Sequence, residues 1–289
     1  MELISTTRRL IEKVSALRYD QKTVGLVPTM GYLHEGHRSL LLRSVAENDI
    51  TIMTLFVNPT QFGANEDLST YPRDLERDLE LARHAGVDIV FAPDNDQMYP
   101  DGSATWVEVD SPITTVLCGA SRPGHFRGVT TIVTKLFGLV MPRRAYFGEK
   151  DFQQLAIIRR MTADLFLPIE IIGCPIVRES DGLAMSSRNS YLNPIQRRKG
   201  LYLSRAIAHA QELVRQGERN AHALRTALVD ILPDDPEMRI DYIECVDTLT
   251  LQPLETLTCS CRLILAVYVD TTRLIDNAPL TIPTTETKE

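Results

Sequence analysis

Short runs of β-branched and apolar residues alternate with longer amphipathic stretches between residues 23 and 172. The short runs predict strands at residues 23–27, 49–57, 87–91, 145–147 and 169–172. The longer stretches predict helices at residues 37–48, 72–85, 128–140 and 152–166. Strands that alternate with helices form βαβ units, so we expect a mostly parallel sheet. Ligands bind such sheets at the carboxyl ends of the strands, which directs attention to the loops that follow them.

The pattern changes near Ile176. Helices are expected at residues 194–216 and 221–231, followed by strands at residues 239–246 and 263–269. The sequence therefore predicts an α/β protein with a mostly parallel-sheet domain at 1–176 and a smaller α+β domain at 177–289. In the helix predicted at 72–85, the core-facing positions are expected to be Leu75, Leu79 and Leu81.

Composition excludes several classes of protein. Asp and Glu number 38 against 31 Lys and Arg, and a net charge of −7 argues against general nucleic-acid binding. No apolar run approaches the ~20 residues of a membrane span, and the charged N-terminal sequence is not expected to be a secretory signal. The five cysteines predict free thiols and a cytoplasmic protein, with the Cys259–x–Cys261 pair packing on a strand.

The loop after the first predicted strand carries two histidines, His34 and His37, between glycines and the start of a helix. Glycines let the backbone approach a ligand, and the N–H groups at a helix N-terminus attract phosphate. A metal site is the alternative for the histidine pair. However, no third His or Cys is near in sequence, and a helix N-terminus favours anions. We therefore interpret this loop as a phosphate-binding site.

Two further segments are open to more than one interpretation. Asn58 and Gln61 follow the second predicted strand, where their amides suit a hydroxy acid, although a turn built around Asn58–Pro59 explains the same residues. The segment 119–129 contains Arg122 and His125. It is either a mobile basic loop over an anion or a solvated connection between helices.

Polar residues also occur at the last predicted strand–helix junction and in the second domain. Lys150 is interpreted either as a phosphate ligand or as a solvated surface lysine. Asp151 either caps the following helix or holds a ribose hydroxyl. The loop 181–189 contains Ser186, Ser187 and Arg188, which are the residue types of a phosphate-gripping loop.

Taken together, these segments resemble the pantoate–β-alanine ligase family. The similarity runs in order through residues 28–37, 56–62, 71–73, 121–129, 147–154, 181–189 and 273–277. The resemblance implies a Rossmann-like N-terminal domain, a smaller lid domain that is associated with dimerisation, and a homodimer. It also implies the condensation of (R)-pantoate with β-alanine, driven by ATP, to give pantothenate, AMP and diphosphate through a pantoyl adenylate, with Mg²⁺ on unidentified ligands.

The resemblance assigns roles to individual residues. The catalytic residues would be His34, His37, Lys150 and Arg188, with His37 as a proton donor. The ATP-binding residues would be Met30, Gly31, Tyr32, Leu33, His34, Glu35, Gly36, His37, Gly148, Glu149, Lys150, Asp151, Val177, Met185, Ser186, Ser187 and Arg188. Pantoate would be bound by Gln61 and Gln154 with help from Asn58, and β-alanine by Gln61.

Two other functions are alternatives for a chain with this histidine loop. An adenylyltransferase would join AMP to a phosphate-bearing acceptor and stop there, whereas the ligase releases AMP. A nucleotide-binding regulatory module would not turn over at all. The neutral Asn58, Gln61 and Gln154 favour a non-phosphorylated acid, and the set of His34, His37, Lys150 and Arg188 argues against a module without catalysis.

Overall fold

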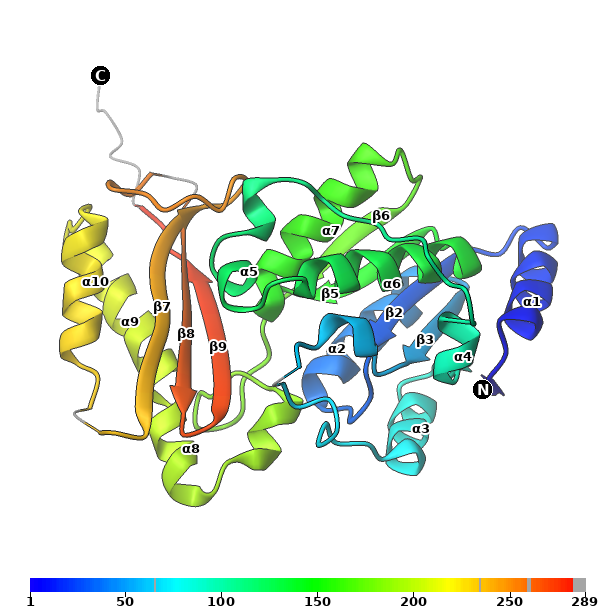
Figure 1. The fold of residues 1–289 in the computed structure, drawn as a ribbon, viewed down its shortest axis with the longest axis horizontal. Helices are drawn as coiled ribbons and strands as arrows, with labels where there is room; N and C mark the ends of the chain where they lie inside the picture. The colour runs from blue at the N-terminus through cyan, green and yellow to red at the C-terminus, as the bar shows by residue number, and fades with distance from the viewer. Residues whose placement is uncertain (65, 234, 259–260, 283–289) are drawn as a thin grey trace. The chain divides into compact units, whose positions relative to one another are not determined.

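The computed structural model describes residues 1–64, 66–233, 235–258 and 261–282, and the chain forms two compact units. The N-terminal unit is Met1–Val177 and the C-terminal unit is Arg178–Glu289 (Figure 1). Within the described residues, no helix is long and apolar enough to cross a membrane. Cys118, Cys174, Cys245 and Cys261 are free and buried, whereas Cys259 lies outside the described residues.

The N-terminal unit contains a sheet whose strands are all parallel. Among the described residues it has six strands, in the order β1 (Glu2–Ile4), β4 (Ile89–Phe91), β3 (Ile50–Leu55), β2 (Val24–Thr29), β5 (Arg144–Gly148) and β6 (Glu170–Cys174). The central strands are apolar on both faces, and Leu26, Ile52 and Met53 are fully buried. Such strands need helices on both sides, as in doubly wound folds. The predicted α/β fold class is confirmed.

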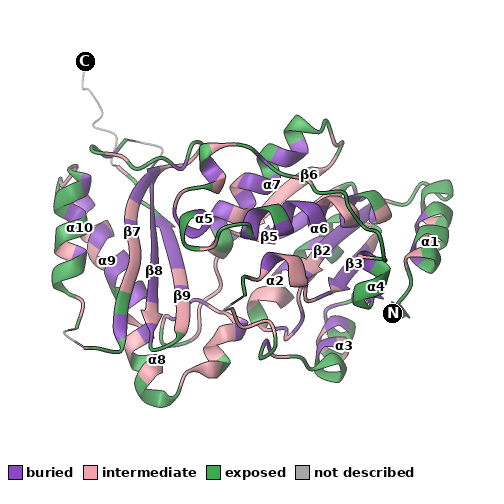
Figure 2. Ribbon diagram, in the orientation of Figure 1, coloured by how far each residue is buried: buried purple, intermediate pink, exposed green. Residues whose placement is uncertain are grey.

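Helices cover both faces of this sheet. The longer ones are α1 (Thr7–Tyr19), α2 (Glu35–Glu47), α3 (Leu75–His84), α6 (His125–Val140) and α7 (Phe152–Asp164), and the short ones are α4 (Asn95–Met98) and α5 (Cys118–Ser121). Right-handed crossovers place α2 and α3 on one face and α1, α6 and α7 on the other, in agreement with the contacts of α2 with α3 and of α6 with α1 and α7 (Figure 1). Figure 2 shows that α6 is buried along much of its length.

The strand order fixes where a ligand site belongs. From β2 the chain crosses over to β3 on one side, whereas from β5 it crosses over to β6 on the other. The carboxyl ends of β2 and β5, which are adjacent strands, therefore form the topological switch point of the sheet. In open α/β sheets this point is the crevice where ligands bind.

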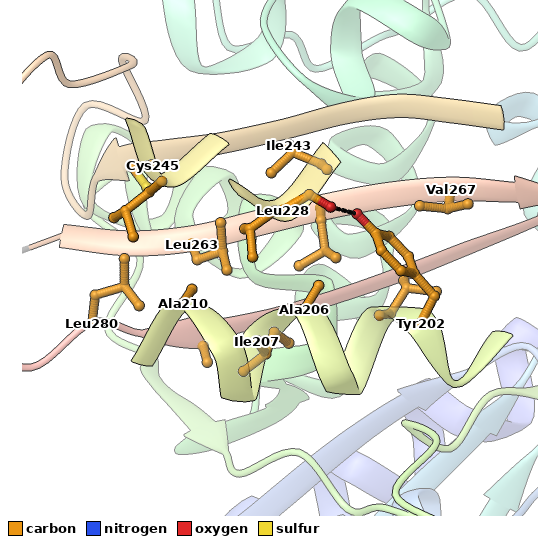
Figure 3. Packing of buried hydrophobic residues seen from close by; sticks show 14 of the residues in the cluster. Tyr202, Ala206, Ile207, Ala210, Leu228, Ile243, Cys245, Leu263, Val267 and Leu280 are labelled. Atoms are coloured by element: carbon orange, nitrogen blue, oxygen red, sulfur yellow. Dashed lines mark hydrogen bonds between the residues drawn. The ribbon is translucent and has the colours of Figure 1, made fainter. Parts of the chain in front are cut away.

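The C-terminal unit is a three-stranded antiparallel sheet packed against helices. Its strands are β7 (Met238–Asp247), β8 (Cys261–Val269) and β9 (Thr272–Pro279), in that order, and its helices are α8 (Pro194–Gly200), α9 (Tyr202–Arg215) and α10 (Ala221–Asp230). Tyr202, Ala206 and Ala210 recur every four residues on α9 and lie in the same core as Leu263 of β8 (Figure 3). The buried hydroxyl of Tyr202 donates a hydrogen bond of 2.5 Å to the carbonyl of Leu228 on α10.

Some of the predicted elements differ from those observed. The helix predicted at 194–216 is divided at Leu201, which ends α8 and precedes α9. The sequence analysis did not predict β1, α1 or β9. In α3 the prediction for Leu75 is wrong, since this side chain is 48% exposed; Leu79 and Leu81 pack partly against the core, and the fully buried positions are Asp78 and Ala82.

Candidate active site

The histidine loop follows β2 and turns into α2. Gly31 and Tyr32 have φ of +87° and +50°, the left-handed region that reverses the chain within two residues. His34 is the N-cap of α2, in extended conformation. The rings of His34 and His37 have centroids 4.0 Å apart, and His37 Nδ1 accepts a hydrogen bond of 3.3 Å from the backbone N–H of His34. Both imidazoles therefore lie together at the N-terminus of a helix.

The protonation state of His37 follows from its contacts. Because Nδ1 accepts a hydrogen bond, the proton of the neutral ring resides on Nε2, which is then a donor. Burial, together with the charges of His34 and Lys150, lowers the pKa of His37 well below its ordinary value of 6.5. At neutral pH the ring is therefore a neutral hydrogen-bond donor.

Lys150 lies at the end of β5, next to the histidine loop. The chain passes from Gly148 through a 3₁₀ turn, η3 (Glu149–Asp151), into α7. The Lys150 side chain is only 18% exposed, which does not fit a solvated surface lysine, and its Nζ lies 4.0 Å from Asp151 Oδ2. Its charge acts on His37, so the ammonium and the imidazole share one region. Asp151 is the N-cap of α7 but its side chain makes no capping hydrogen bond, so the capping interpretation is wrong.

The residues expected to bind ATP in the N-terminal unit are therefore concentrated at the switch point. The loop 30–37 follows β2, and residues 148–151 follow β5. Leu33 differs from its neighbours because its side chain is fully buried in the core. Val177 is the last residue of this unit.

Asn58 follows β3 and is the N-cap of a second 3₁₀ turn, η1 (Pro59–Gln61), so the turn interpretation of Asn58–Pro59 holds. Its side chain is 1% exposed. The amide nitrogen donates to Gln61 Oε1 at 3.2 Å and to the Gly128 carbonyl at 3.1 Å. The amide oxygen accepts from Thr60 at 2.9 Å and from the Tyr99 hydroxyl at 2.8 Å. This full set of partners suits a residue that supports Gln61 better than one that binds an acid directly.

Gln61 is held through both its side chain and its backbone. Its Nε2 lies 3.0 Å from the sulfur of Met30, which links the segment after β3 to the loop after β2. Its carbonyl lies 2.8 Å from His125 Nδ1 and accepts a hydrogen bond of 3.3 Å from Arg122 Nη2. Gln61 therefore has a fixed position beside the histidine loop.

Arg122 and His125 form a neutral network with Glu66. The Arg122 guanidinium binds the Glu66 carboxylate, and its Nη1 lies 3.1 Å from His125 Nε2. Because arginine only donates and a carbonyl only accepts, His125 carries its proton on Nδ1. Burial and the neighbouring Arg122 charge lower the pKa of His125 to about 4. The segment 119–129 thus connects α5 and α6, and its Arg122 and His125 are engaged with Glu66 and the Gln61 carbonyl.

Adjacent glutamines at the start of α7 have different surroundings. Gln153 is buried, and its amide bonds the backbone of Ile113, Val116 and Cys118. Gln154, in the same turn, is half-buried. The side chain of Gln153 therefore supports the fold, which leaves Gln154 as the glutamine of this turn that suits a ligand.

The C-terminal unit contains the second predicted phosphate loop. Ser186 is the N-cap of η4 (Ser187–Tyr191) and accepts a hydrogen bond of 3.3 Å from the Arg188 N–H. Ser187 is buried, and Met185 and Arg188 are half-buried. Asn189 donates to the Ala184 carbonyl at 3.0 Å and thereby closes the part of this loop that contains residues 185–188.

Several residues that hold these loops are not among the predicted site residues. Glu66 and Tyr99 support Gln61 and Asn58. Asp276, in the family-like segment 273–277, binds Arg178 at the start of the C-terminal unit. Their partners are distant in sequence, so no local pattern indicated them.

Comparison with known proteins identifies relatives over almost the whole chain. The model of the family described as pantoate-beta-alanine ligase matches residues 2–279. A pantothenate synthetase of Moorella thermoacetica is 56% identical over 282 residues, which cover 98% of this chain and 99% of that protein.

Two solved structures are similar in fold. The crystal structure of pantothenate synthetase from Thermus thermophilus is 47% identical with a TM-score of 0.93, and the match covers 97% of this chain and 100% of that one. The crystal structure of pantoate-beta-alanine ligase from Francisella tularensis, complexed with beta-gamma ATP and beta-alanine, is 34% identical with a TM-score of 0.77. That match covers 96% of this chain and 97% of the other.

Proposed function

The chain belongs to the pantoate–β-alanine ligase family, and from this premise we propose that it condenses (R)-pantoate with β-alanine through a pantoyl-adenylate intermediate. The observation that carries the proposal is the clustering of His34, His37 and Lys150 at the ends of β2 and β5. This crevice is where an α/β sheet binds a nucleotide. The Francisella tularensis relative was solved with an ATP compound and β-alanine, which supports the same substrates here.

In the first step the pantoate carboxylate attacks the α-phosphorus of ATP and diphosphate leaves. A carboxylate is already ionised at neutral pH, so this step needs no general base. The difficulty is the approach of an anion to a polyanion, which fixed donors and cations reduce. The Nε2–H of His37, the imidazole of His34 and the ammonium of Lys150 are the groups for this task, and the neutral ring of His37 would donate a hydrogen bond, and not a proton, as charge builds on the phosphate.

The remaining nucleotide contacts rest on the family motifs. Gly148 and Asp151 would hold the ribose, and Val177 would contact the adenine through its backbone. Ser186, Ser187 and Arg188 of the C-terminal unit would bind phosphate oxygens. In the N-terminal unit, residues 30–36 and Glu149 would line the nucleotide, and Met185 would do so in the C-terminal unit.

In the second step the β-alanine amine attacks the pantoyl carbonyl carbon, and AMP leaves with the oxygen that bridged carbon and phosphorus. Gln61 and Gln154 would orient the pantoyl group, and Gln61 would also contact β-alanine. Asn58 would contribute by fixing the Gln61 amide, in keeping with its own saturated hydrogen bonds. The amine must lose a proton before it attacks.

Mg²⁺ would enter with the ATP phosphates. Within the described residues, no group of three or more His, Cys, Asp or Glu side chains is placed to hold a metal ion. Mg²⁺ is usually bound through substrate phosphates, water and one or two carboxylates, so its ligands would come largely from ATP. When bound, the ion would neutralise part of the charge on the diphosphate. We further propose a homodimer that resides in the cytoplasm, as expected from the family resemblance and the free thiols.

An omission assay tests the function. ATP with pantoate alone should release about one equivalent of diphosphate per site, and addition of β-alanine should give continuous turnover with AMP. An adenylyltransferase would retain AMP in its product, and a regulatory module would release no diphosphate. Pantoate labelled with ¹⁸O in its carboxylate tests the adenylate, because one labelled oxygen should appear in AMP. Label in inorganic phosphate, with ADP as the other product, would contradict that intermediate.

A further inference from the structure

Asp78 is a buried carboxylate that binds the backbone of the histidine loop. It lies on α3, is 2% exposed, and is separated from the loop by about 45 residues of chain. Its Oδ2 accepts a hydrogen bond of 2.7 Å from the Tyr32 N–H, and its Oδ1 accepts one of 2.6 Å from the Leu33 N–H. Each carboxylate oxygen therefore holds one of two consecutive amides immediately before His34.

The loop at this point adopts a conformation that needs outside support. Tyr32 has a φ of +50°, which is costly for a residue with a side chain, and it follows a glycine at +87°. A Cβ at Gly31 would lie 3.0 Å from Asp78 Oδ2, so the carboxylate and the loop are closely fitted. The backbone N–H groups of Tyr32 and Leu33 both find an acceptor in this carboxylate, and a buried amide that loses its acceptor is costly.

The charge of Asp78 is partly offset by groups that belong to the same contact. Burial raises the pKa of Asp78, while the two backbone N–H groups and the neighbouring Arg77 favour the ionised form. Asp78 also lies in the first turn of α3, where the helix dipole stabilises an anion. The guanidinium of Arg77 lies over the ring of Tyr32, 4.8 Å from its centroid. Two adjacent residues of α3 thus hold Tyr32, one through its backbone and one through its ring.

We infer that Asp78, assisted by Arg77, is a positioning residue for the phosphate-binding histidines. The carboxylate fixes the two residues that precede His34, and thereby sets where α2 begins and how His34 and His37 face a nucleotide. This inference rests on the proposed function of that loop. A displacement of about 1 Å in such groups is enough to reduce a reaction rate by ~10²-fold.

The test compares Asp78→Asn with Glu80→Gln, which makes the same charge change at an exposed position of α3. Asparagine keeps one acceptor but presents an N–H₂ to the second amide, so it cannot hold both. Single-turnover diphosphate release from ATP and pantoate should fall ~10–10²-fold in Asp78→Asn at saturating substrate, a kcat effect. Glu80→Gln should match the wild type. Equal rates in Asp78→Asn and Glu80→Gln would overturn the inference.

A spectroscopic readout separates positioning from a general loss of stability. ¹⁵N NMR of the wild-type imidazoles should show His37 as the neutral Nε2–H tautomer, and folded Asp78→Asn should show a mixture of tautomers. If Asp78→Asn does not fold, Arg77→Ala tests the inference in its place, because Arg77 is exposed and its replacement leaves the core intact. Arg77→Ala should slow the same step ~3–10-fold through looser loop positioning, and an unchanged rate would refute the inference. A wild-type protein that releases no pantoate-dependent diphosphate would instead refute the proposed function.

Discussion

Asp276 accepts hydrogen bonds from both terminal nitrogens of Arg178, at 2.6 and 3.0 Å, while it is itself almost completely buried. Arg178 Nη1 also donates to the Gly182 carbonyl at 3.1 Å. Through this arginine, strand β9 holds the first residue of the C-terminal unit and the start of the loop 181–189. The family-like segment 273–277 therefore supports a loop that lies about 90 residues earlier in the sequence.

Replacement of Asp276 by asparagine should destabilise the C-terminal unit. It leaves the partly buried guanidinium of Arg178, whose side chain is 31% exposed, without its buried counter-charge, which costs about 2 kcal/mol. Urea unfolding followed by far-UV circular dichroism measures the loss. The double variant Arg178→Met/Asp276→Asn should recover part of it, because no uncompensated charge remains, and an equal or larger loss in the double variant would contradict this account.

Replacement of Lys150 by alanine should slow adenylate formation by ~10²–10³-fold, comparable to the loss of one preorganised donor. The fold should remain intact because the side chain stabilises charge that develops in the reaction. The expected result is a reduced rate of single-turnover diphosphate release, with unchanged fluorescence of Trp106. A rate near that of the wild type would remove Lys150 from the mechanism.

Replacement of Gln61 by alanine should raise the KM for pantoate more than the KM for ATP. The amide is fixed by Asn58 and Met30 on the side of the site assigned to the acid, so its loss removes substrate contacts and not phosphate contacts. Steady-state kinetics with each substrate varied in turn make the comparison. An increase confined to ATP would show that Gln61 has been assigned to the wrong substrate.

The neutral His125 should make the N-terminal unit less stable in mild acid. Its pKa is about 4 in the folded chain against an ordinary value of 6.5, so its stabilising contribution is complete above pH 6.5 and is lost as the pH falls toward 4. Between pH 7.5 and 5 the expected loss is about 2 kcal/mol. Urea unfolding followed through Trp106, the single tryptophan of the sequence, reports on this unit.

The matched variant is His125→Asn, whose amide can still donate to the Gln61 carbonyl but does not titrate. Its free energy of unfolding should change less between pH 7.5 and 5 than that of the wild type. If the free energy of unfolding changes with pH by the same amount in both proteins, folding does not lower the pKa of His125.

Replacement of Tyr202 by phenylalanine should cost the C-terminal unit about 1–2 kcal/mol, because the carbonyl of Leu228 loses its donor in a buried place (Figure 3). Burial raises the pKa of Tyr202 to about 12, so the hydroxyl keeps its proton at all ordinary pH values. Far-UV circular dichroism during urea unfolding measures the cost. An unchanged free energy of unfolding would show that the Leu228 carbonyl finds another donor in the variant.

The parallel sheet could be predicted from the sequence because β2 and β3 are short runs of β-branched and apolar residues, each followed by an amphipathic helix. The histidine loop could be found because its glycines and histidines are adjacent in sequence. In contrast, β1 is only three residues long, too short to show a period. The sequence does hold a signal for α1, in the N-cap Thr6 and the buried Leu10 and Val14, and the prediction missed it.

Asp78 illustrates what a sequence pattern cannot reveal. Three leucines indicated the inward face of α3, yet Leu75 is exposed and the charged Asp78 is buried. Burial of a carboxylate is tolerated only when its oxygens accept hydrogen bonds. For Asp78 the donors are backbone N–H groups of the loop that follows β2. Such partners carry no side-chain signature, so they become apparent only once the fold brings them together.

The loops after β2 and β3 are held mainly by different elements, and the contact between Gln61 and Met30 joins them. Asp78 of α3 holds the loop after β2, whereas His125 of α6 and the hydroxyl of Tyr99 hold the segment after β3. This modularity has a consequence for engineering. Under the proposed assignments, side chains around Gln61 can be exchanged to change acid selectivity while Asp78 still holds the nucleotide loop, provided that the contact between Gln61 and Met30 is kept.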